Sequence, residues 1–479
     1  MRVIRLISMT LILCLSLGFL YAQDNEDKMG GSVIIGATTI NNTNYQQIGL
    51  RADLPIWKLG FGLDIQLYID DQGNIREEDW DEFEDYLDKV YYIRWAKKGD
   101  PFYLKVGGLE NASLGYGIIL NNYSNMVQYP TYKRIGMETS MKIGPVGTEL
   151  FINNFKEAFA DKPGMVLGAR ASYDLPVFKL VAGASFASDF NEYNGLFDTD
   201  GDGYPDAIDA YPNDKKFVTQ RDKWALDLQG LPNTNEIIDT LVARGVIDST
   251  QTQYLPKYKE MTSTVSIVGV DLGLPLISTD MMKLDIYAQA AQIIDYGFGF
   301  AFPGVKFNLG PVSAYAEFRH AGEEFLFGYF NNTYEIERAR TFGKQVITKK
   351  QFLESVEAMD GFYAGLGIDM FKWAYLNIGY QDLKGDNMNA KTLNGDLNIT
   401  KVPKLSTAKA YYSQDNVDDL SEWKTPSTIM GYVLGYEISS GVSMNFDYRY
   451  TFEDKDGNGK IQGDDETNKS ISIYTAIKF

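Results

Sequence analysis

Residues 61–70 read FGLDIQLYID, and apolar side chains alternate along them with small or polar ones. In an extended chain successive side chains point to opposite faces, so this period of two indicates a β-strand with one apolar face. The apolar set begins at Phe61, and the other set contains Asp64. The same pattern returns at 102–106, 284–290, 312–320, 376–381 and 442–452, and therefore predicts strands along almost the whole chain.

A soluble β-sandwich would alternate in the same way, because one face of each sheet meets the core and the other meets water. Two features favour a transmembrane barrel instead. Many alternating segments run for ten or more residues, which suits a tilted membrane span better than an ordinary strand. Aromatic residues also gather near the segment ends, as the interfacial girdles of membrane barrels require; they are Trp57, Trp95, Tyr380, Tyr450 and Phe452.

The last residues, SISIYTAIKF at 470–479, form one more amphipathic strand and end in Phe479. This ending resembles the C-terminal strand of Gram-negative outer-membrane β-barrels, and the chain resembles porin-like proteins in general without matching a particular family. The resemblance implies an all-β fold, a transmembrane antiparallel barrel, inserted in the lipid bilayer of the outer membrane. Counting the alternating segments predicts about 18–20 strands.

Connections between the segments are alternately short and long, which predicts the topology. The long ones lie at 70–88, 189–258, 321–358, 414–425 and 453–467. Outer-membrane barrels have short periplasmic turns and long external loops, so we expect these five outside the cell. Residues 109–130 lack clean alternation, and we interpret them as a loop turned into the lumen rather than as two weakly patterned strands.

The N-terminal residues 1–22 have the organisation of a secretory signal peptide. Arg2 and Arg5 precede an apolar run, and Ala22 offers a small residue for cleavage. An N-terminal membrane anchor is the alternative, but the apolar run is short for a spanning helix. Cleavage would leave residues 23–479 as a single barrel domain without cysteine, since Cys14 is the only one, and would shift the net charge from −19 to −21.

Charged residues occupy the polar face of the predicted strands. A charge that faces lipid at the bilayer midplane costs about 2–4 kcal/mol, so we expect these side chains to face a water-filled lumen. A braced, plugged barrel in which the charges pair across the lumen is the alternative. The expected lumen residues are Arg51, Asp64, Arg94, Lys105, Arg170, Lys283, Asp285, Glu317, Arg319, Asp447 and Arg449, with Gln289, Asn377 and Gln381 beside them.

An aspartate-rich segment inside the long connection 189–258 has calcium-ligand spacing. Positions 1, 3, 5, 9 and 12 of the segment are Asp198, Asp200, Asp202, Asp206 and Asp209, and Gly203 stands at position 6. It resembles the thrombospondin type 3 calcium repeat, although Tyr211 stands where that family usually has a cysteine. The resemblance implies a bound Ca²⁺. The alternative is a solvated acidic loop.

A second acidic segment, 454–465, resembles an EF-hand loop. The implied ligands are Asp454, Asp456, Asn458, the backbone carbonyl of Lys460, and Asp465 at position 12. EF-hands usually carry glutamate at position 12, and Glu466 falls one residue too late for that spacing. The flanks read as strands, so we expect a calcium loop on a hairpin, with a solvated acidic hairpin as the alternative.

Little in the sequence supports catalysis or nucleic-acid binding. A net charge of −19 leaves nothing to neutralise phosphates, which argues against nucleic acid as a partner. The single histidine, His320, falls on the lipid-facing side of its predicted strand, and no nucleophile elbow or phosphate-binding loop accompanies it. We therefore expect no enzyme.

The sequence thus predicts an outer-membrane porin-like channel that passes small hydrophilic solutes through a mixed-charge lumen. The alternative is a closed barrel that displays calcium-stiffened loops for adhesion or envelope-complex assembly. Residues 235–248 also show helical apolar spacing, and we expect this helix to pack on its own loop or over the barrel mouth.

Overall fold

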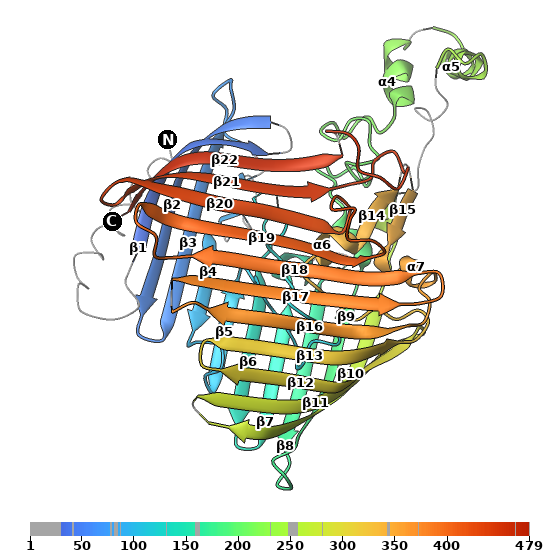
Figure 1. The fold of residues 1–479 in the computed structure, drawn as a ribbon. Coiled ribbons are helices and arrows are strands. Elements are labelled where there is room, and N and C mark those ends of the chain that lie inside the picture. The colour runs from blue at the N-terminus through green and yellow to red at the C-terminus, as the bar shows by residue number, and fades with distance from the viewer. Residues whose placement is uncertain are drawn as a thin grey trace.

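A closed antiparallel β-barrel of 20 strands is the central feature of the computed structural model (Figure 1). Strand β1 (Gly30–Ile40) pairs with both β2 (Thr43–Ile56) and the last strand, β22 (Thr467–Lys478), and this pairing closes the ring. The structure describes residues 30–478 except 41–42, 77–78, 81–84, 87, 131, 159–162, 230, 248–256, 280, 343–344, 372 and 465. The predicted signal peptide, Cys14 and Phe479 therefore lie outside the described residues.

The remaining barrel strands follow in chain order and confirm the all-β fold class and the predicted strand number. They are β3 (Leu59–Ile69), β4 (Val90–Trp95), β5 (Phe102–Gly107), β6 (Gly136–Ile143), β7 (Val146–Ile152), β8 (Val166–Asp174), β9 (Val181–Asp189), β10 (Val265–Ser278), β11 (Met282–Ile293), β12 (Phe298–Leu309), β13 (Val312–Ala321), β16 (Met359–Asp369), β17 (Ala374–Lys384), β18 (Asn389–Ile399), β19 (Leu405–Val417), β20 (Thr428–Ser439) and β21 (Val442–Phe452).

The connections differ in length between the two ends of the barrel. The start of β1, the end of β22 and nine short turns share one end, which we call the short-turn end. The opposite end, the long-loop end, carries all five of the predicted long connections. A two-stranded hairpin of β14 (Ala339–Phe342) and β15 (Gln345–Thr348) lies at this end, with the short helices α6 (Tyr334–Glu337) and α7 (Lys349–Leu353) beside it.

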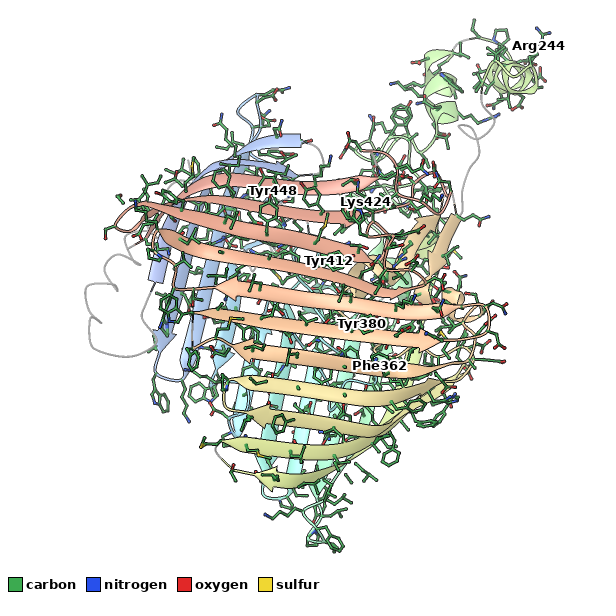
Figure 2. The ribbon with its side chains drawn as sticks, in the orientation of Figure 1. Arg244, Phe362, Tyr380, Tyr412, Lys424 and Tyr448 are labelled. Carbon is green, nitrogen blue, oxygen red and sulfur yellow. The ribbon has the colours of Figure 1, made fainter. Side chains whose placement is uncertain are left out.

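Large apolar side chains cover the outer surface of the barrel. Figure 2 shows Phe362, Tyr380, Tyr412 and Tyr448 on the outside of β16, β17, β19 and β21. Phe362 is 46% exposed although it lies in the middle of a strand. A closed sheet satisfies its own backbone hydrogen bonds and leaves no edge, so this apolar surface fits a barrel that is embedded in lipid.

Two chain segments turn into the lumen from the long-loop end. We call residues 108–135 the first inner segment and residues 322–338 the second. They are joined by a parallel bridge between Leu120 and Phe330. The amide of Phe330 donates to the carbonyl of Ile119 at 3.1 Å, and the amide of Asn121 donates to the carbonyl of Phe330 at 3.0 Å. The expected in-turned loop at 109–130 is therefore confirmed, and a second segment that the sequence analysis did not single out packs against it.

Both inner segments pack on side chains of the barrel interior. The ring of Tyr116 stacks on that of Tyr287 with 4.1 Å between centroids, and the guanidinium of Arg319 lies over the ring of Phe327. Behind these contacts, apolar side chains of both segments form one buried cluster with the long-loop ends of the strands. A hydrophobic plug thus fills the outer part of the lumen along this side.

A small helical hairpin projects from the long-loop end. It contains α4 (Gln220–Asp227) and α5 (Thr234–Ala243), and it stands away from the barrel rim in Figure 1. The helix predicted at 235–248 is present as α5 but ends at Ala243. It packs against α4 and buries Ile238 rather than covering the barrel mouth. Among the described residues, no helix is long and apolar enough to cross a membrane.

Candidate functional site in the barrel lumen

A cavity of about 1010 Å³ occupies the lumen beside the plug. It runs from the short-turn end, where Gly30 and Lys478 line it, to the first inner segment at Asn122 and Tyr129. Its walls belong to strands β1–β4 and β17–β22. The cavity is therefore a polar chamber whose inner end is formed by the plug.

The charged residues of the chamber are held by partners in its own wall. The Nε of Arg51 lies 3.2 Å from Asp64, whose other carboxylate oxygen accepts a hydrogen bond from the hydroxyl of Tyr129 at 2.6 Å. The Nε of Arg449 donates to the hydroxyl of Tyr411 at 2.9 Å, and its Nη1 donates to the carbonyl of Tyr129. Asp447 faces the same chamber.

Charged side chains on the lumen face outside the chamber also form ion pairs with one another. Arg170 bridges Glu149 at 2.7 Å and Asp271 at 2.6 Å, and Arg319 lies 2.5 Å from Glu317. The structure thus places the predicted Arg170, Glu317 and Arg319 in the interior and brings them against carboxylates.

Other predicted lumen residues also lie on inward faces. Arg94 and Lys105 approach the ring of Tyr92. Lys283 and Asp285 share the strand face of the buried Tyr287 and make no ion pair with any described residue. Gln289 accepts a hydrogen bond from the Ile118 amide and donates to Glu317, Gln381 contacts Arg319, and Asn377 donates to Asp396.

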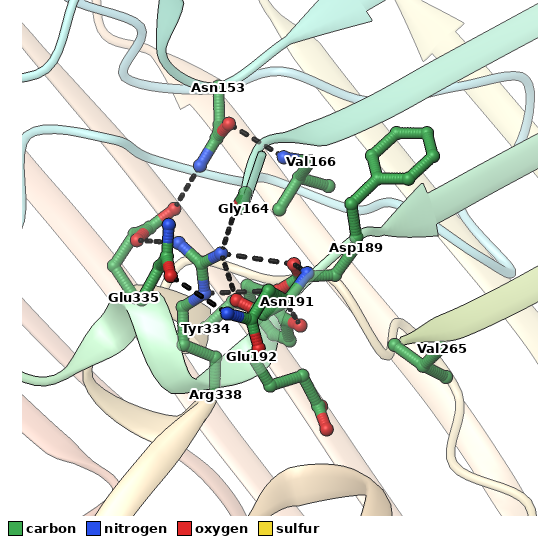
Figure 3. A network of polar contacts seen from close by, with 12 residues as sticks. Asn153, Gly164, Val166, Asp189, Asn191, Glu192, Val265, Tyr334, Glu335 and Arg338 are labelled. Atoms are coloured by element: carbon green, nitrogen blue, oxygen red, sulfur yellow. Dashed lines mark hydrogen bonds and ion pairs between the residues drawn. The ribbon is translucent and has the colours of Figure 1, made fainter. Parts of the chain in front are cut away.

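A buried network of charges ties the plug to the barrel rim (Figure 3). Arg338, which is 0% exposed, lies 3.0 Å from Asp189 and 3.2 Å from both Glu157 and Glu335. Arg134 lies 3.1 Å from Glu335. These five residues come from the two inner segments, the β7–β8 connection and the end of β9, so the network joins segments that are distant in sequence.

Neutral side chains complete this network. Asn153 donates to Glu335 at 2.9 Å, and the hydroxyl of Tyr334 donates to Asp189 at 2.7 Å. Removing one partner of a buried ion pair typically costs about 3–5 kcal/mol, because the other charge is left uncompensated. The sequence analysis missed this cluster, since its members lie in connections without a periodic pattern.

Acid is expected to weaken the network through Glu335. Burial alone would raise the pKa of this carboxyl, but Arg134 and Arg338 outweigh burial and hold its pKa at about 2, below its ordinary value of 4.5. A lowered folded-state pKa contributes stability above pH 4.5 that is lost as the pH falls toward 2. The stability difference between the native chain and Glu335→Gln should therefore shrink between pH 4.5 and 2, measured by urea unfolding. A difference that stays constant across this range would contradict the assignment.

The aspartate-rich segment brings three of its predicted ligands together. Single carboxylate oxygens of Asp198, Asp200 and Asp202 lie within 4.8 Å of one another. The Asp198 carboxylate also accepts the amides of Gly201, Asp202 and Gly203, which gives the loop its sharp turn. Asp206 is turned aside, because its carboxylate accepts hydrogen bonds from Thr199.

Asp209 lies near this cluster but is not one of the three carboxylates that converge. The side chain is nine-tenths buried, and its Oδ2, like one oxygen each of Asp200 and Asp202, is buried without a hydrogen-bond partner among the described residues. Burial, together with the neighbouring carboxylates of Asp202 and Asp200, raises the pKa of Asp209 to about 6. Crowded oxygens of this kind fit a hard cation such as Ca²⁺, whose charge would offset their repulsion.

The second acidic loop brings Glu466 together with two of its predicted ligands. Single oxygens of Asp454, Asp456 and Glu466 lie within 4.8 Å of one another. Asp465, the predicted ligand at position 12, lies outside the described residues. The Glu466 carboxylate is drawn into the loop because it accepts the amides of Lys455 and Gln462. The sequence analysis set Glu466 aside because it falls one position after the twelfth. The structure corrects this, because these hydrogen bonds bring the Glu466 carboxylate into the cluster.

The side chain of Asn458, another predicted ligand of this loop, makes hydrogen bonds within the loop. The side chain of Asn458 donates to Asp456 at 2.7 Å and accepts the amide of Lys460 at 2.8 Å. Both acidic clusters could hold a metal ion.

His320 lies on the outer face of β13, as its parity predicts. Its Nδ1 is 2.8 Å from the Asp360 carboxylate on the neighbouring strand, and its ring packs on Phe300. The placement gives it one acidic partner on the lipid side of the barrel rather than a position in the chamber.

The chain is similar in structure to several solved proteins, and it was also compared with family models and curated proteins. No protein-family model matches the chain, and no curated protein matches it. Among solved structures it is similar to the ferric enterobactin receptor PfeA of Pseudomonas aeruginosa, with 9% identity, a TM-score of 0.36, and coverage of 95% of this chain and 82% of that one.

Two further structures show the same level of likeness. For the siderophore receptor PirA of Acinetobacter baumannii the identity is 8%, the TM-score 0.36 and the coverage 95% and 81%. For OccD1 (OprD) the identity is 7%, the TM-score 0.30 and the coverage 95% and 96%. The assignment of this chain to the closed membrane-type barrels accordingly rests on its own strand pairing and apolar outer surface.

Proposed function

We propose that this protein is an outer-membrane channel of porin-like type that passes small hydrophilic solutes, with the two inner segments as its gate. The observation that carries the proposal is the chamber of about 1010 Å³ with a mixed-charge wall. A barrel of 20 strands is too wide for its own wall side chains to fill, and the plug leaves this polar part of the lumen open, as a path for a hydrophilic solute requires. The exported N-terminal signal predicted from sequence supports the outer membrane of a Gram-negative-type cell as its location.

Single-channel recording tests the proposal. The refolded mature chain is inserted into a planar bilayer, and the current is recorded under an applied voltage. Discrete steps support a gated channel, because the inner segments must move to let ions pass. A barrel that is folded, shown by its heat-modifiable migration, but that never conducts would refute the channel.

The second candidate is a closed barrel that displays its loops for adhesion or envelope-complex assembly. The observation in its favour is the seal itself: the apolar cluster and the buried charges around Arg338 fill the outer lumen. The extended connection between β9 and β10, which carries α4 and α5, supplies a surface for a partner. A non-conducting barrel would favour this candidate.

We further propose that Ca²⁺ binds both acidic loops and stiffens the external connections. In each loop the bound ion would link the carboxylates that the turn holds close together, and this link would make the loop more rigid. Weak, millimolar-range sites suffice for this role in an extracellular setting.

Replacement of Asp209 by Asn is expected to weaken metal binding at the first loop by about tenfold or more, since it removes one charged oxygen ligand. Terbium luminescence, excited through the nearby Tyr204 and Tyr211, measures this binding, and calcium should displace the terbium. Asp227→Asn, which removes the same charge from α4, is the matched control. Equal affinity in the two variants would contradict the site.

A further inference from the structure

The hydrogen-bonding groups that face the chamber fall into two sets. Most charged groups already have partners: Arg51 with Asp64, Arg449 with Tyr411, and Asp396 with Asn377. Lys409, Asp447 and Lys478 also line the chamber, and their side chains make no hydrogen bond or ion pair with another described residue. The four cations and five carboxylates of the wall nearly balance, so the chamber has little net charge with which to select an ionic solute.

Several neutral amides and a tyrosine hydroxyl also remain free. The side chains of Asn394 and Asn398, which project inward from β18, make no hydrogen bond with any described residue. The same holds for the side chain of Asn122, on the first inner segment, and for the hydroxyl of Tyr375. An amide offers two donors and an acceptor, which matches a ligand whose groups also donate and accept.

Tyrosine rings supply the second feature of the chamber. A register shift between β3 and β4 pairs Gly62 with Tyr92 and Leu63 with Val90, which leaves Tyr91 as an additional residue. Both rings consequently line the chamber, where the hydroxyl of Tyr91 donates to Glu110 at 2.9 Å and that of Tyr92 to Asp53 at 2.5 Å. Such a bulge redirects a side chain that would otherwise face outward.

Glycine makes room for one of these rings. A Cβ atom at Gly62 would lie 2.6 Å from the ring of Tyr92, so the ring rests directly on the strand backbone. The side chains of Arg94 and Lys105 lie over the ring of Tyr92, which leaves the ring of Tyr91 to offer an apolar face to a ligand. Tyr375 adds a further ring at the short-turn end, where it is 44% exposed.

We propose that the chamber binds an uncharged, polyhydroxylated solute of the size of a mono- or disaccharide. Such a ligand presents hydroxyls to the free amides and apolar C–H faces to the tyrosine rings. The cavity is at the upper end of the usual size of small-molecule sites, about 300–1000 Å³. The proposal rests on the proposed channel for the route by which the solute arrives, but binding itself does not require conduction.

Isothermal titration of the folded, detergent-solubilised barrel tests the proposal with maltose as the neutral probe and with citrate and lysine as charged probes. Saturable binding of maltose alone is expected. Absence of maltose binding, or equal binding of citrate or lysine, would overturn the proposal. Because the titration needs no passage across a membrane, maltose binding by a barrel that never conducts would refute the channel and leave the sugar site standing.

A matched pair of variants on β17 locates the site. Tyr375→Ala removes an inward ring and should weaken maltose binding by about three- to tenfold, the loss expected for one stacking contact. Tyr380→Ala removes an outward ring from the same strand and should leave the affinity unchanged. Equal affinities of the two variants would place the binding elsewhere.

Discussion

Replacing residues 113–122 by Asn-Gly is expected to raise the single-channel conductance by about tenfold or more, because barrels of 16–18 strands already hold an aqueous channel when nothing fills them. Ala112 and Tyr123 form a hydrogen-bonded antiparallel pair, with N–O distances of 2.9 and 2.8 Å, so a two-residue turn can close the gap. The excised tip carries the stacked ring of Tyr116 and the bridge at Leu120.

A second deletion separates loss of the gate from general damage to the long-loop end. Replacing 220–247, which carry α4 and α5, by a short Gly-Ser linker removes a hairpin that projects away from the rim. This variant should conduct as the intact chain does. If both deletions changed conductance equally, or if neither did, the inner segment would not be the gate.

Arg338→Met is expected to lower the free energy of unfolding by about 3–5 kcal/mol, because three carboxylates lose the cation that they share. Glu157 and Glu335 would keep Arg134 as a cation, whereas Asp189 would keep no ion pair with any described residue. Urea unfolding measures the loss. Trypsin cleavage at Lys133 in the still-folded barrel would report that the first inner segment has been released.

The matched control is Arg221→Met. Arg221 lies 2.7 Å from Asp239 in an ion pair between α4 and α5, and the Asp239 side chain is 63% exposed. Exposed pairs contribute about 0–1 kcal/mol, so this variant should unfold almost as the native chain does. An Arg338→Met barrel that matched this control in both stability and trypsin resistance would show that the buried network does not hold the plug.

The alternation of apolar and polar side chains was enough to predict most of the fold. The inward Asp64 and the outward Phe61 follow from a period of two, because a sheet has only two faces and lipid rejects charge. For the same reason His320 could be placed outside. The in-turned loop at 109–130 was predictable from the opposite signal, a stretch where the alternation fails.

The two acidic loops show how far residue spacing alone predicts which carboxylates come together. Asp198, Asp200 and Asp202 cluster as expected because a tight turn brings alternate residues together within a few positions. The spacing did not predict Glu466 as a member of the second cluster, because its position depends on how the whole loop closes and on which amides donate to its carboxylate. Asp206 failed to join for a similar reason, because Thr199 engages its carboxylate.

By itself the sequence determined the antiparallel barrel, its approximate strand number and the sign of each face, since these depend on neighbours a few residues apart. Only the tertiary structure decided that the lumen is plugged, that Arg338 is surrounded by carboxylates from distant connections, and that a β-bulge turns Tyr91 into the chamber. Those features depend on pairings across the closed ring, between residues that no local periodicity relates.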